Sequence, residues 1–300
     1  MEEANKKDFK GFSMSMNMDY SNGYFDKNST QMAGNCWIHA GINNMLQNPK
    51  GKEIINNLVY KNKENGSVTV YLPGAAEKGF PKPNGDGMYT YSEAKLLNSS
   101  FNISMGDGDY TAFILAINDF RAESQNRHDD GGKFDEFCEI VLGEDTGNTI
   151  VNGNESWCRE TKIAFTNLKN LYKTALAGNF LDDETEKSYE KKLEKITSEL
   201  ELLKISEIEH PNERYNKIRE KFEDKNFILF ASVDNDTNLH GELENNDVFE
   251  TISGHAYTIL EMNEDSVVLE ESNQPGERIT YKVEDFMEIF TISILPLETV

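Results

Sequence analysis

Apolar residues in the first part of the chain recur mainly at helical spacing. The run from Cys36 to Leu46 spaces its apolar residues as one face of a helix does, and Pro49 follows it. Gly34 and Asn35 stand directly before this run, where residues that break or cap local structure are expected. The sequence therefore predicts a helix whose first residue is Cys36.

Three further patterns organise the rest of the first half. Residues 67–72 alternate and are rich in β-branched side chains, which predicts a strand. Residues 79–87 contain Pro, Gly, Asn and Asp at short intervals, which predicts a long loop with several turns. Asp109 is suited to cap a helix through residues 112–120, and we expect the apolar face of that helix to pack against the Cys36 helix.

Residues 159–225 follow a different pattern and form a predicted helical insertion. One helix is expected to end at Gly178. Residues 189–203 repeat apolar side chains at four-three spacing with Lys and Glu between them, which predicts a helical hairpin, and Pro211 starts a third helix. The insertion could dock a partner or act as a lid. The interpretation that we prefer is a helical elaboration that packs on its own lobe.

Strand patterns dominate the last quarter of the chain. The acidic stretch of residues 234–247 is predicted to be a loop. A short helical segment is expected near Phe286. The predicted strands cover residues 227–233, 255–260, 266–269, 279–283 and 290–295.

These patterns together predict an α+β protein with three segments. Residues 1–158 would form a mainly helical lobe, residues 159–225 the helical insertion, and residues 226–300 a β-rich lobe. The polar stretch before about residue 30 could be an extended arm or a lobe edge.

Charge and hydropathy narrow the possible partners. The 300 residues include 53 acidic and 30 basic side chains, a formal net charge of −23. Such a surface disfavours nucleic acid and acidic membranes and attracts basic polypeptides. No apolar run approaches the roughly 20 residues of a membrane span, and residues 1–7 lack the apolar core of a signal peptide. We therefore expect a cytoplasmic protein, with export independent of a signal sequence left open, and the oligomeric state also stays open.

The sequence gives little support for a metal or another cofactor. The three cysteines, Cys36, Cys138 and Cys158, are too widely spaced for a zinc site or a disulfide framework. Residues 84–87 and 107–109 supply carboxylates, but neither stretch fits the EF-hand loop, so we interpret both as turns. We expect no cofactor, and calcium is possible without a recognisable site.

Cys36 is the candidate nucleophile, and His255 is the candidate base among the five histidines. A thiol at a helix N-terminus is shifted toward the thiolate, which is the nucleophilic form. His39 lies on the same predicted helix as Cys36 and could neighbour the thiol, whereas His128, His210 and His240 lie in polar stretches and are expected to face solvent. His255 instead begins a predicted strand directly after a glycine.

A second strand after the His255 strand leads to Asn273. If the two strands are adjacent and antiparallel, the Asn273 amide can lie beside the imidazole and fix its tautomer and orientation. Cys36, His255 and Asn273 thus form a candidate catalytic set.

The candidate residues and their neighbours resemble the pattern of a known protein family. Gln31, then Asn-Cys-Trp at residues 35–37, then Gly-His-Ala-Tyr at residues 254–257, then Asn273 looks like the papain-like cysteine proteases, and most like the calpain-type protease core. The Gly-Gly pair with the short helix after it, residues 131–143, is also similar to that core in outline. The predicted apolar strand of residues 227–232 also resembles the strand that such cores place before the histidine.

The resemblance implies a two-lobed papain-like fold and a cysteine endopeptidase acting on polypeptide. It implies Cys36 as nucleophile, His255 as general base and then acid, and Asn273 as the residue that orients the imidazole. Gln31 and the backbone N–H of Cys36 would form the oxyanion hole. Deamidation or transglutaminase-like transfer on the same triad is an alternative, and so is a catalytically inactive binding module.

Two features depart from the family pattern. The spacing from Gln31 to Cys36 is one residue shorter than is usual in the family, and Gln-Pro-Gly at residues 274–276 stands where the family tends to place a Trp after the Asn. Both bear on catalytic efficiency more than on the fold.

Overall fold

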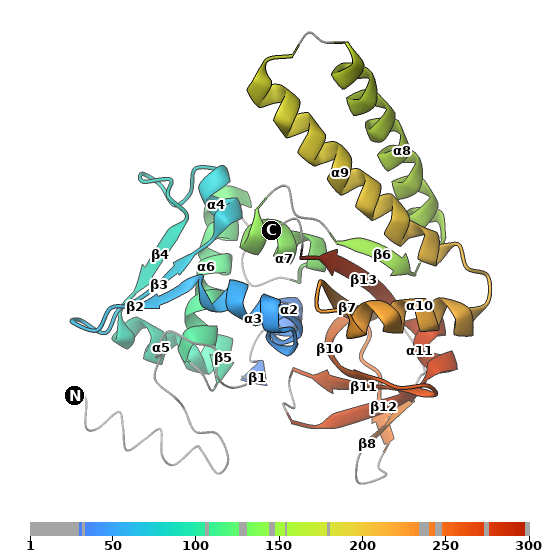
Figure 1. Ribbon diagram of the computed structural model, residues 1–300. Helices are drawn as coiled ribbons and strands as arrows, with labels where there is room; N and C mark the ends of the chain where they lie inside the picture. The colour runs from blue at the N-terminus through green and yellow to red at the C-terminus, as the bar shows by residue number, and fades with distance from the viewer. Residues whose placement is uncertain are drawn as a thin grey trace. The chain divides into compact units, whose positions relative to one another are not determined.

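The protein is a mixed α+β protein that folds as two compact units (Figure 1). The computed structural model describes residues 30–31, 34–105, 108–125, 131–143, 148–153, 155–178, 181–233, 240–243, 248–272 and 276–297. The first unit comprises residues 1–146 and 270–277, and the second comprises residues 147–269 and 278–300. The chain therefore passes between the units three times, and residues 159–225 belong to the second unit.

The first unit combines helices with two small sheets, one of β1 and β5 and one in the order β2-β3-β4. The strand predicted within residues 67–72 is β3, and the helix predicted after Gly131 and Gly132 is α7. The elements are β1 (Thr30–Gln31), α2 (Cys36–Gln47), α3 (Pro49–Asn56), β2 (Val59–Lys61), β3 (Val68–Tyr71), α4 (Pro73–Glu77), β4 (Met88–Tyr91), α5 (Glu93–Ile103), β5 (Ser104–Met105), α6 (Gly108–Gln125) and α7 (Phe134–Leu142).

Helix α2 is buried along most of its length, from Trp37 to Met45. Its polar side chains are accommodated by α6: the Tyr110 hydroxyl donates to Asn43 Oδ1 at 2.5 Å, and the His39 ring stacks on the Tyr110 ring with centroids 5.9 Å apart. A buried helix needs such partners because an unpaired polar group in an apolar interior costs free energy. The predicted helix at Cys36 is confirmed. The helix predicted through residues 112–120 is present within α6, and the contacts just described join it to α2 through Tyr110. The expected packing of its apolar face against α2 stays a prediction.

One prediction for the first unit was wrong in detail, and two strands were missed. Asp109 is the second residue of α6 and lies in its first turn, because the helix already begins at Gly108. Strands β2 and β4 were not predicted because each is only three or four residues long and keeps large apolar side chains exposed, with Tyr60 67% and Met88 52% exposed. Such short, half-exposed strands lack the strong alternation that marks a strand in sequence.

The second unit is built on an eight-stranded sheet in the order β6-β13-β7-β10-β11-β12-β8-β9. Every strand predicted in the last quarter is present, and the segment near Phe286 is helix α11. The elements are β6 (Thr149–Asn152), α8 (Glu155–Ala177), α9 (Asp183–Ser206), α10 (Pro211–Glu223), β7 (Phe227–Val233), β8 (His240–Leu243), β9 (Val248–Glu250), β10 (His255–Met262), β11 (Ser266–Glu271), β12 (Arg278–Lys282), α11 (Val283–Ile289) and β13 (Thr291–Pro296).

Strand β7 lies in the interior of this sheet and pairs antiparallel with both β13 and β10. Its residue Ala231 lies opposite Ile292 on one side and Tyr257 on the other. All three side chains are buried in one core, to which α10 contributes Tyr215 and α11 contributes Phe286. Strand β7 is paired on both edges and is mostly buried. This explains why its sequence is a nearly continuous apolar run, the pattern from which it was predicted.

The predicted helical insertion corresponds to α8, α9 and α10. Helices α8 and α9 form a hairpin that projects beyond the sheet of their unit (Figure 1), and Tyr172 packs edge-on against Tyr189 across it. The last turns of α9 and the buried face of α10 join the core of the sheet, through Leu202, Ile205 and Ile218 among others. These parts of the insertion therefore pack on their own unit. None of the described helices is long and apolar enough to cross a membrane.

The loop predicted for residues 234–247 was wrong for residues 240–243, which form β8 and pair with β9 and β12. Gly241 was interpreted as a loop residue, but it permits close packing in the strand. A Cβ atom there would lie 2.3 Å from Ile279 Cγ2 and 2.8 Å from the Tyr281 ring. A glycine within a strand often marks such a close approach.

Glu199 is a buried carboxyl on α9, only 4% exposed, and its Oε1 atom lies 3.9 Å from Lys195 Nζ. Burial raises the pKa of Glu199 to about 7, and the nearby lysine offsets only part of that effect. The folded state therefore binds a proton that the unfolded state releases between about pH 4.5 and pH 7.

Because the pKa of Glu199 is higher in the folded state than in the unfolded state, its contribution to stability is present below about pH 4.5 and is lost as the pH rises through about 7. We expect Glu199→Gln to increase the free energy of unfolding at pH 8 by about 2 kcal/mol relative to wild type, with little difference at pH 5. Urea denaturation at both pH values measures this. Glu194→Gln, an exposed position on the same helix, is the matched control and should show no such pH-dependent gain.

Candidate active site

Cys36 is the first residue of α2 and is partly exposed, whereas the helix that follows it is buried. The first helical hydrogen bonds run from the N–H groups of Ile38 and His39 to the Asn35 carbonyl, at 2.9 and 3.1 Å. The positive end of the helix dipole therefore lies at the thiol, which favours the thiolate. The sequence prediction for the local structure of Cys36 is confirmed.

The residue after Cys36 anchors this end of the helix. The Trp37 ring is 1% exposed and fills the space beside Gly132, where a Cβ atom would lie 2.5 Å from the ring. The Arg121 guanidinium lies 5.0 Å above the same ring, which is within reach of a cation–π contact. Only glycine leaves room for Trp37 at position 132, so the Gly-Gly pair and the Cys36 end of α2 are packed together.

Arg121 also holds the Gly-Gly pair from the other side. Its Nη2 donates to the Gly131 carbonyl at 3.1 Å, and its Nε lies 2.9 Å from Glu136 Oε1 on α7. Arg121 is 1% exposed, and a buried cation needs such partners. A Cβ atom added at Gly131 would meet nothing within 4 Å, so its backbone borders open space. Sequence analysis missed Arg121, although a lone arginine within the mainly apolar run of α6 was a usable signal.

The three cysteines differ in accessibility. Cys138 is fully buried on α7, and burial raises the pKa of its thiol, with the Asp135 carboxylate adding to the rise. Cys158 is buried at the start of α8, with its Sγ 3.8 Å from the Ile150 carbonyl. Cys36 is the only one of the three that is not buried. It therefore has the exposure that a nucleophile requires.

His255 opens strand β10 in the second unit and pairs with Val233 of β7. Gly254 precedes it with φ of 63°, a conformation that favours glycine. The imidazole is mostly buried, and the ring of Tyr257 meets it edge-on with centroids 5.1 Å apart. The Tyr257 hydroxyl in turn accepts the Ile252 N–H at 2.9 Å. Pairing with β7 and contact with Tyr257 together fix the position of His255 in its unit.

Strands β10 and β11 are neighbours in the sheet, as predicted. The turn between them is closed by the Asn263 N–H, which donates to the Ser266 carbonyl at 2.8 Å. Strand β11 ends at Glu271. Asn273 lies outside the described residues, so its predicted role beside His255 stays a prediction.

The remaining predicted site residues fall in different places. Gln31 lies in β1 opposite Ser104, and its side chain is outside what the structure describes. Cys36 belongs to the first unit and His255 to the second. His39 is fully buried against Tyr110.

Two of the three histidines that were predicted to face solvent are exposed. These are His210 and His240, so the prediction is confirmed for them. His128 lies outside the described residues.

The glycine-rich stretch of residues 84–87 is a turn, in which Asp86 Oδ1 accepts the Met88 N–H at 3.0 Å. Asp107 of the other candidate calcium loop lies outside the described residues. Among the side chains that the structure describes, no group of three or more His, Cys, Asp or Glu is placed to hold a metal ion.

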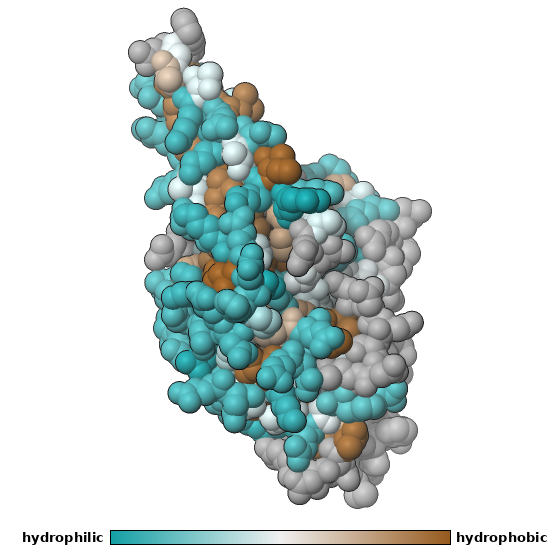
Figure 2. Space-filling model, turned by 90° about the vertical axis from the view of Figure 1, so that its right-hand side faces the viewer, coloured by the Kyte–Doolittle hydropathy of each residue, from teal (hydrophilic) through white to brown (hydrophobic). Residues whose placement is uncertain are grey.

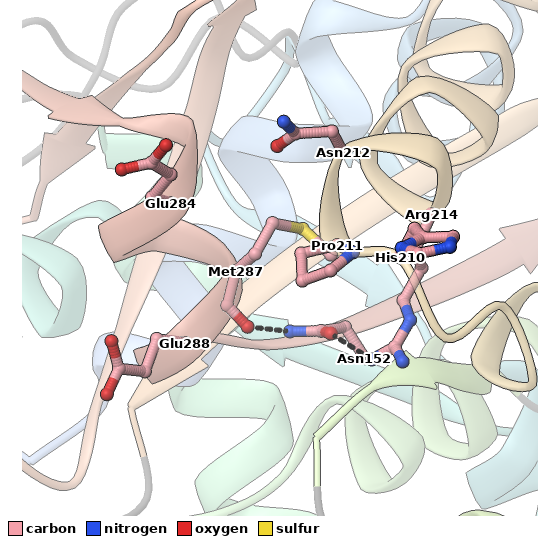
Figure 3. Close-up of a pocket in the computed structure, with 8 residues that line it drawn as sticks. All are labelled: Asn152, His210, Pro211, Asn212, Arg214, Glu284, Met287 and Glu288. Carbon is pink, nitrogen blue, oxygen red and sulfur yellow. Dashed lines mark hydrogen bonds between the residues drawn. The ribbon is translucent and has the colours of Figure 1, made fainter.

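The second unit also contains a groove of about 510 Å³ where the N-terminus of α10 faces α11 (Figure 3). Glu284 and Glu288 lie on one side of it, and His210 and Arg214 lie on the other. Neither Cys36 nor His255 lines this groove. Its lining residues are Asn152, His210, Pro211, Asn212, Arg214, Glu284, Met287 and Glu288.

Asn152 forms the floor of the groove and joins three elements. Its side-chain amide donates to the carbonyls of Met287 and Phe290, at 3.0 and 2.7 Å, and its Oδ1 accepts from Arg214 Nη1 at 3.0 Å. Arg214 also donates twice to the Ile208 carbonyl. With these contacts Asn152 caps the end of α11 and ties it to β6 and α10.

Comparison with known proteins gave no match: no family model matches the chain, and neither a curated protein nor a solved structure matches it.

Replacing Asn152 with Ala would leave two buried carbonyls without their donors and Arg214 without one acceptor. We expect Asn152→Ala to lower the free energy of unfolding by about 2–3 kcal/mol, since each lost buried partner costs roughly 1 kcal/mol or more. Urea denaturation measures the loss. Asn212→Ala, an exposed position in the same groove, should change stability by less than about 0.5 kcal/mol, and equal losses in the two variants would contradict this account.

Proposed function

We propose that this protein is a papain-like cysteine endopeptidase, most similar to the calpain type, with Cys36 as its nucleophile and His255 as its general base. The observation that carries the proposal is the position of Cys36. It is the one cysteine that is not buried, and it lies at the N-terminus of a helix that is buried behind it. That position favours the reactive thiolate and leaves it accessible to a substrate.

The fold is consistent with this assignment. The nucleophile lies in a largely helical unit, and the histidine opens a strand of an antiparallel region in a separate, sheet-based unit. A papain-like fold divides its catalytic residues between two lobes in the same way. The contact of Gly132 with Trp37, directly after the nucleophile, also supports the calpain-type resemblance, because it gives the Gly-Gly pair a place at the proposed site.

The proposed reaction is acyl transfer to water. The Cys36 thiolate attacks the carbonyl carbon of a peptide bond, and the carbonyl oxygen becomes an oxyanion held by the Cys36 backbone N–H and the Gln31 amide. The leaving amine takes a proton from the His255 imidazolium, which leaves a thioester. His255 then removes a proton from water, the resulting hydroxide attacks the thioester, and the acid and the thiolate are released. Asn273 would hold the imidazole in its productive tautomer.

Polypeptide is the proposed substrate class, and basic segments are favoured within it. A formal charge of −23 attracts basic chains over a distance of several ångströms in moderate salt. The acyl-enzyme could also be resolved by an amine, or formed from a glutamine side chain, so product analysis decides between hydrolysis of peptides and deamidation.

Labelling with an epoxide directed at cysteine proteases tests the proposal. We expect intact mass spectrometry to show one adduct on the native wild-type protein, located at Cys36 and absent from Cys36→Ala. His255→Ala should reduce the labelling rate by about 100-fold or more, the lower end of a general-base contribution. His210→Ala removes an exposed histidine of the same unit and is the matched control.

An equal labelling rate in His255→Ala and His210→Ala would show that His255 does not activate Cys36 and would sink the peptidase proposal. Labelling at Cys36 without peptide cleavage would instead favour the deamidase or transferase chemistry. If native Cys36 does not react at all, the inactive binding module becomes the better description.

A further inference from the structure

Charge distinguishes the surface of this protein more than apolar area does. On the face that carries the α8–α9 hairpin, Figure 2 shows hydrophobic side chains scattered among many hydrophilic ones. Apolar residues scattered in this way need no partner. Acidic side chains outnumber basic ones by 53 to 30 in the chain as a whole. Recognition of another molecule is therefore expected where the chain leaves carboxylates without a basic partner.

Three carboxylates gather in the first unit, where the second half of α6 lies beside the loop before β4. Asp119 and Glu123 lie one turn apart on α6, and Asp86 belongs to the turn of residues 84–87. We call these three side chains the acidic cluster. Each accepts one hydrogen bond from a neutral donor, so its second carboxylate oxygen can still accept from a ligand. The donors are the Tyr91 hydroxyl to Asp119 Oδ2 at 2.8 Å, the Met88 N–H to Asp86 Oδ1 at 3.0 Å and the Lys82 N–H to Glu123 Oε2 at 3.4 Å.

A buried hydroxyl lies close to the acidic cluster and has no hydrogen-bond partner among the groups that the structure describes. It belongs to Tyr89 on β4, which is 5% exposed. Burial raises the pKa of this hydroxyl, and the carboxylates of Glu123, Asp119 and Asp86 add to the rise, so all three lie near it. A buried polar group without a partner costs free energy, and a phenol can both donate and accept. The hydroxyl is therefore an unsatisfied group turned toward the acidic cluster.

Within the described part of the chain, the acidic cluster forms no ion pair of its own. Lys82 approaches Glu123 through its backbone, but its ammonium lies 4.9 Å from the centroid of the Phe80 ring. The cluster thus keeps one negative charge for each of its three carboxylates. Because Asp86 and Glu123 are exposed, a cation can approach them from solvent.

The spacing of the acidic cluster favours an organic cation over a metal ion. Calcium holds its oxygen ligands at about 2.3–2.6 Å. Across the residues that the structure describes, no three His, Cys, Asp or Glu side chains are grouped closely enough to hold a metal ion. A guanidinium is larger, and its five N–H donors point outward in one plane. It can therefore bond carboxylates that stand too far apart to share a metal ion, whereas the compact ammonium of lysine reaches fewer acceptors.

The guanidinium is expected to belong to a polypeptide. A free small molecule is usually enclosed by a pocket that buries most of its surface, whereas two members of the acidic cluster, Asp86 and Glu123, are exposed. An arginine side chain that reaches an exposed cluster from a longer chain gains further contacts beside it. The net charge of −23 also attracts basic chains.

We propose that the acidic cluster, together with the Tyr89 hydroxyl, binds an arginine side chain of a partner polypeptide. The guanidinium donates charge-assisted hydrogen bonds to the carboxylates. One N–H reaches the Tyr89 oxygen when the exposed side chain of Glu123 or Asp86 turns aside to admit the ligand. The site lies wholly in the first unit, and the proposal does not depend on the peptidase activity.

Binding of a fluorescent peptide with a single arginine and no other charge tests the proposal, on protein that carries Cys36→Ala so that no cleavage can occur. We expect fluorescence anisotropy to show binding of this peptide, and binding weaker by about 10-fold or more when citrulline, the neutral isostere of arginine, replaces the arginine. A lysine peptide should bind with intermediate affinity. Glu123→Gln should weaken binding of the arginine peptide by about 10-fold. Glu53→Gln removes an exposed carboxylate on α3 of the same unit and is the matched control, which should bind like the wild type.

Tyr89→Phe separates a role in binding from a role in stability, because it removes only the hydroxyl. We expect the arginine peptide to bind about 5-fold more weakly, while urea denaturation of the free protein shows a free energy of unfolding that is unchanged or higher, since a buried group without a partner is lost. A less stable Tyr89→Phe protein with unchanged peptide binding would contradict the part of the proposal that concerns this hydroxyl.

Three results would overturn the proposal as a whole. The first is no binding of the arginine peptide at protein concentrations up to about 1 mM, or equal binding of the arginine and citrulline peptides. The second is equal weakening by Glu123→Gln and Glu53→Gln, which would reduce the effect to the general attraction of an acidic protein. The third is displacement of the bound peptide by calcium that Glu123→Gln abolishes, which would assign the acidic cluster to a metal ion instead.

Discussion

Burial of α2 is the constraint on which the candidate nucleophile depends. A helix enclosed from Trp37 to Met45 cannot slide or rotate without breaking the contacts of its polar residues, among them the hydrogen bond from Tyr110 to Asn43. Trp37, held between Gly132 and Arg121, fixes the end of the helix that reaches solvent. Cys36 thus takes its position from the packing behind it, and this is the kind of rigid support that a reacting group requires.

The second unit positions His255 by a different means. His255 is held by the backbone pairing of its strand, β10, with β7, which is itself paired on its other edge with β13. Moving His255 by one residue would turn every side chain of β10 to the opposite face of the sheet and would expose the buried ring of Tyr257. The hydrophobic pattern of the strand therefore specifies the register, and the register specifies the histidine.

The elements that could be predicted from the sequence are those with long, regular patterns. Helices α8, α9 and α10 and strands β7, β10 and β13 each repeat their period often enough to be recognised. Strands β2, β4 and β8 were missed because they are short and because tertiary contacts, such as Gly241 against Ile279, decide their conformation.

In the candidate site, too, some features could be predicted from the sequence and others could not. The positions of Cys36 at the start of a helix and of His255 at the start of a strand could be predicted from the residues next to them. The contact of Arg121 with Trp37 and the capping of α11 by Asn152 instead join segments that are distant in sequence. A single sequence carries no signal for such pairings. The papain-like arrangement itself therefore remains a proposal, which rests on the chemistry of Cys36 and His255.

The three passages of the chain between the units have a consequence for how the protein can be divided. Residues 270–277 belong to the first unit although the strands on either side of them belong to the sheet of the second. A single nick near residue 146 would give two fragments, and residues 270–277 of the first unit would stay on the fragment that carries the second unit. Neither unit is one uninterrupted stretch of coding sequence, so recombination with a single breakpoint could not transfer either unit whole, and the two are expected to be inherited together.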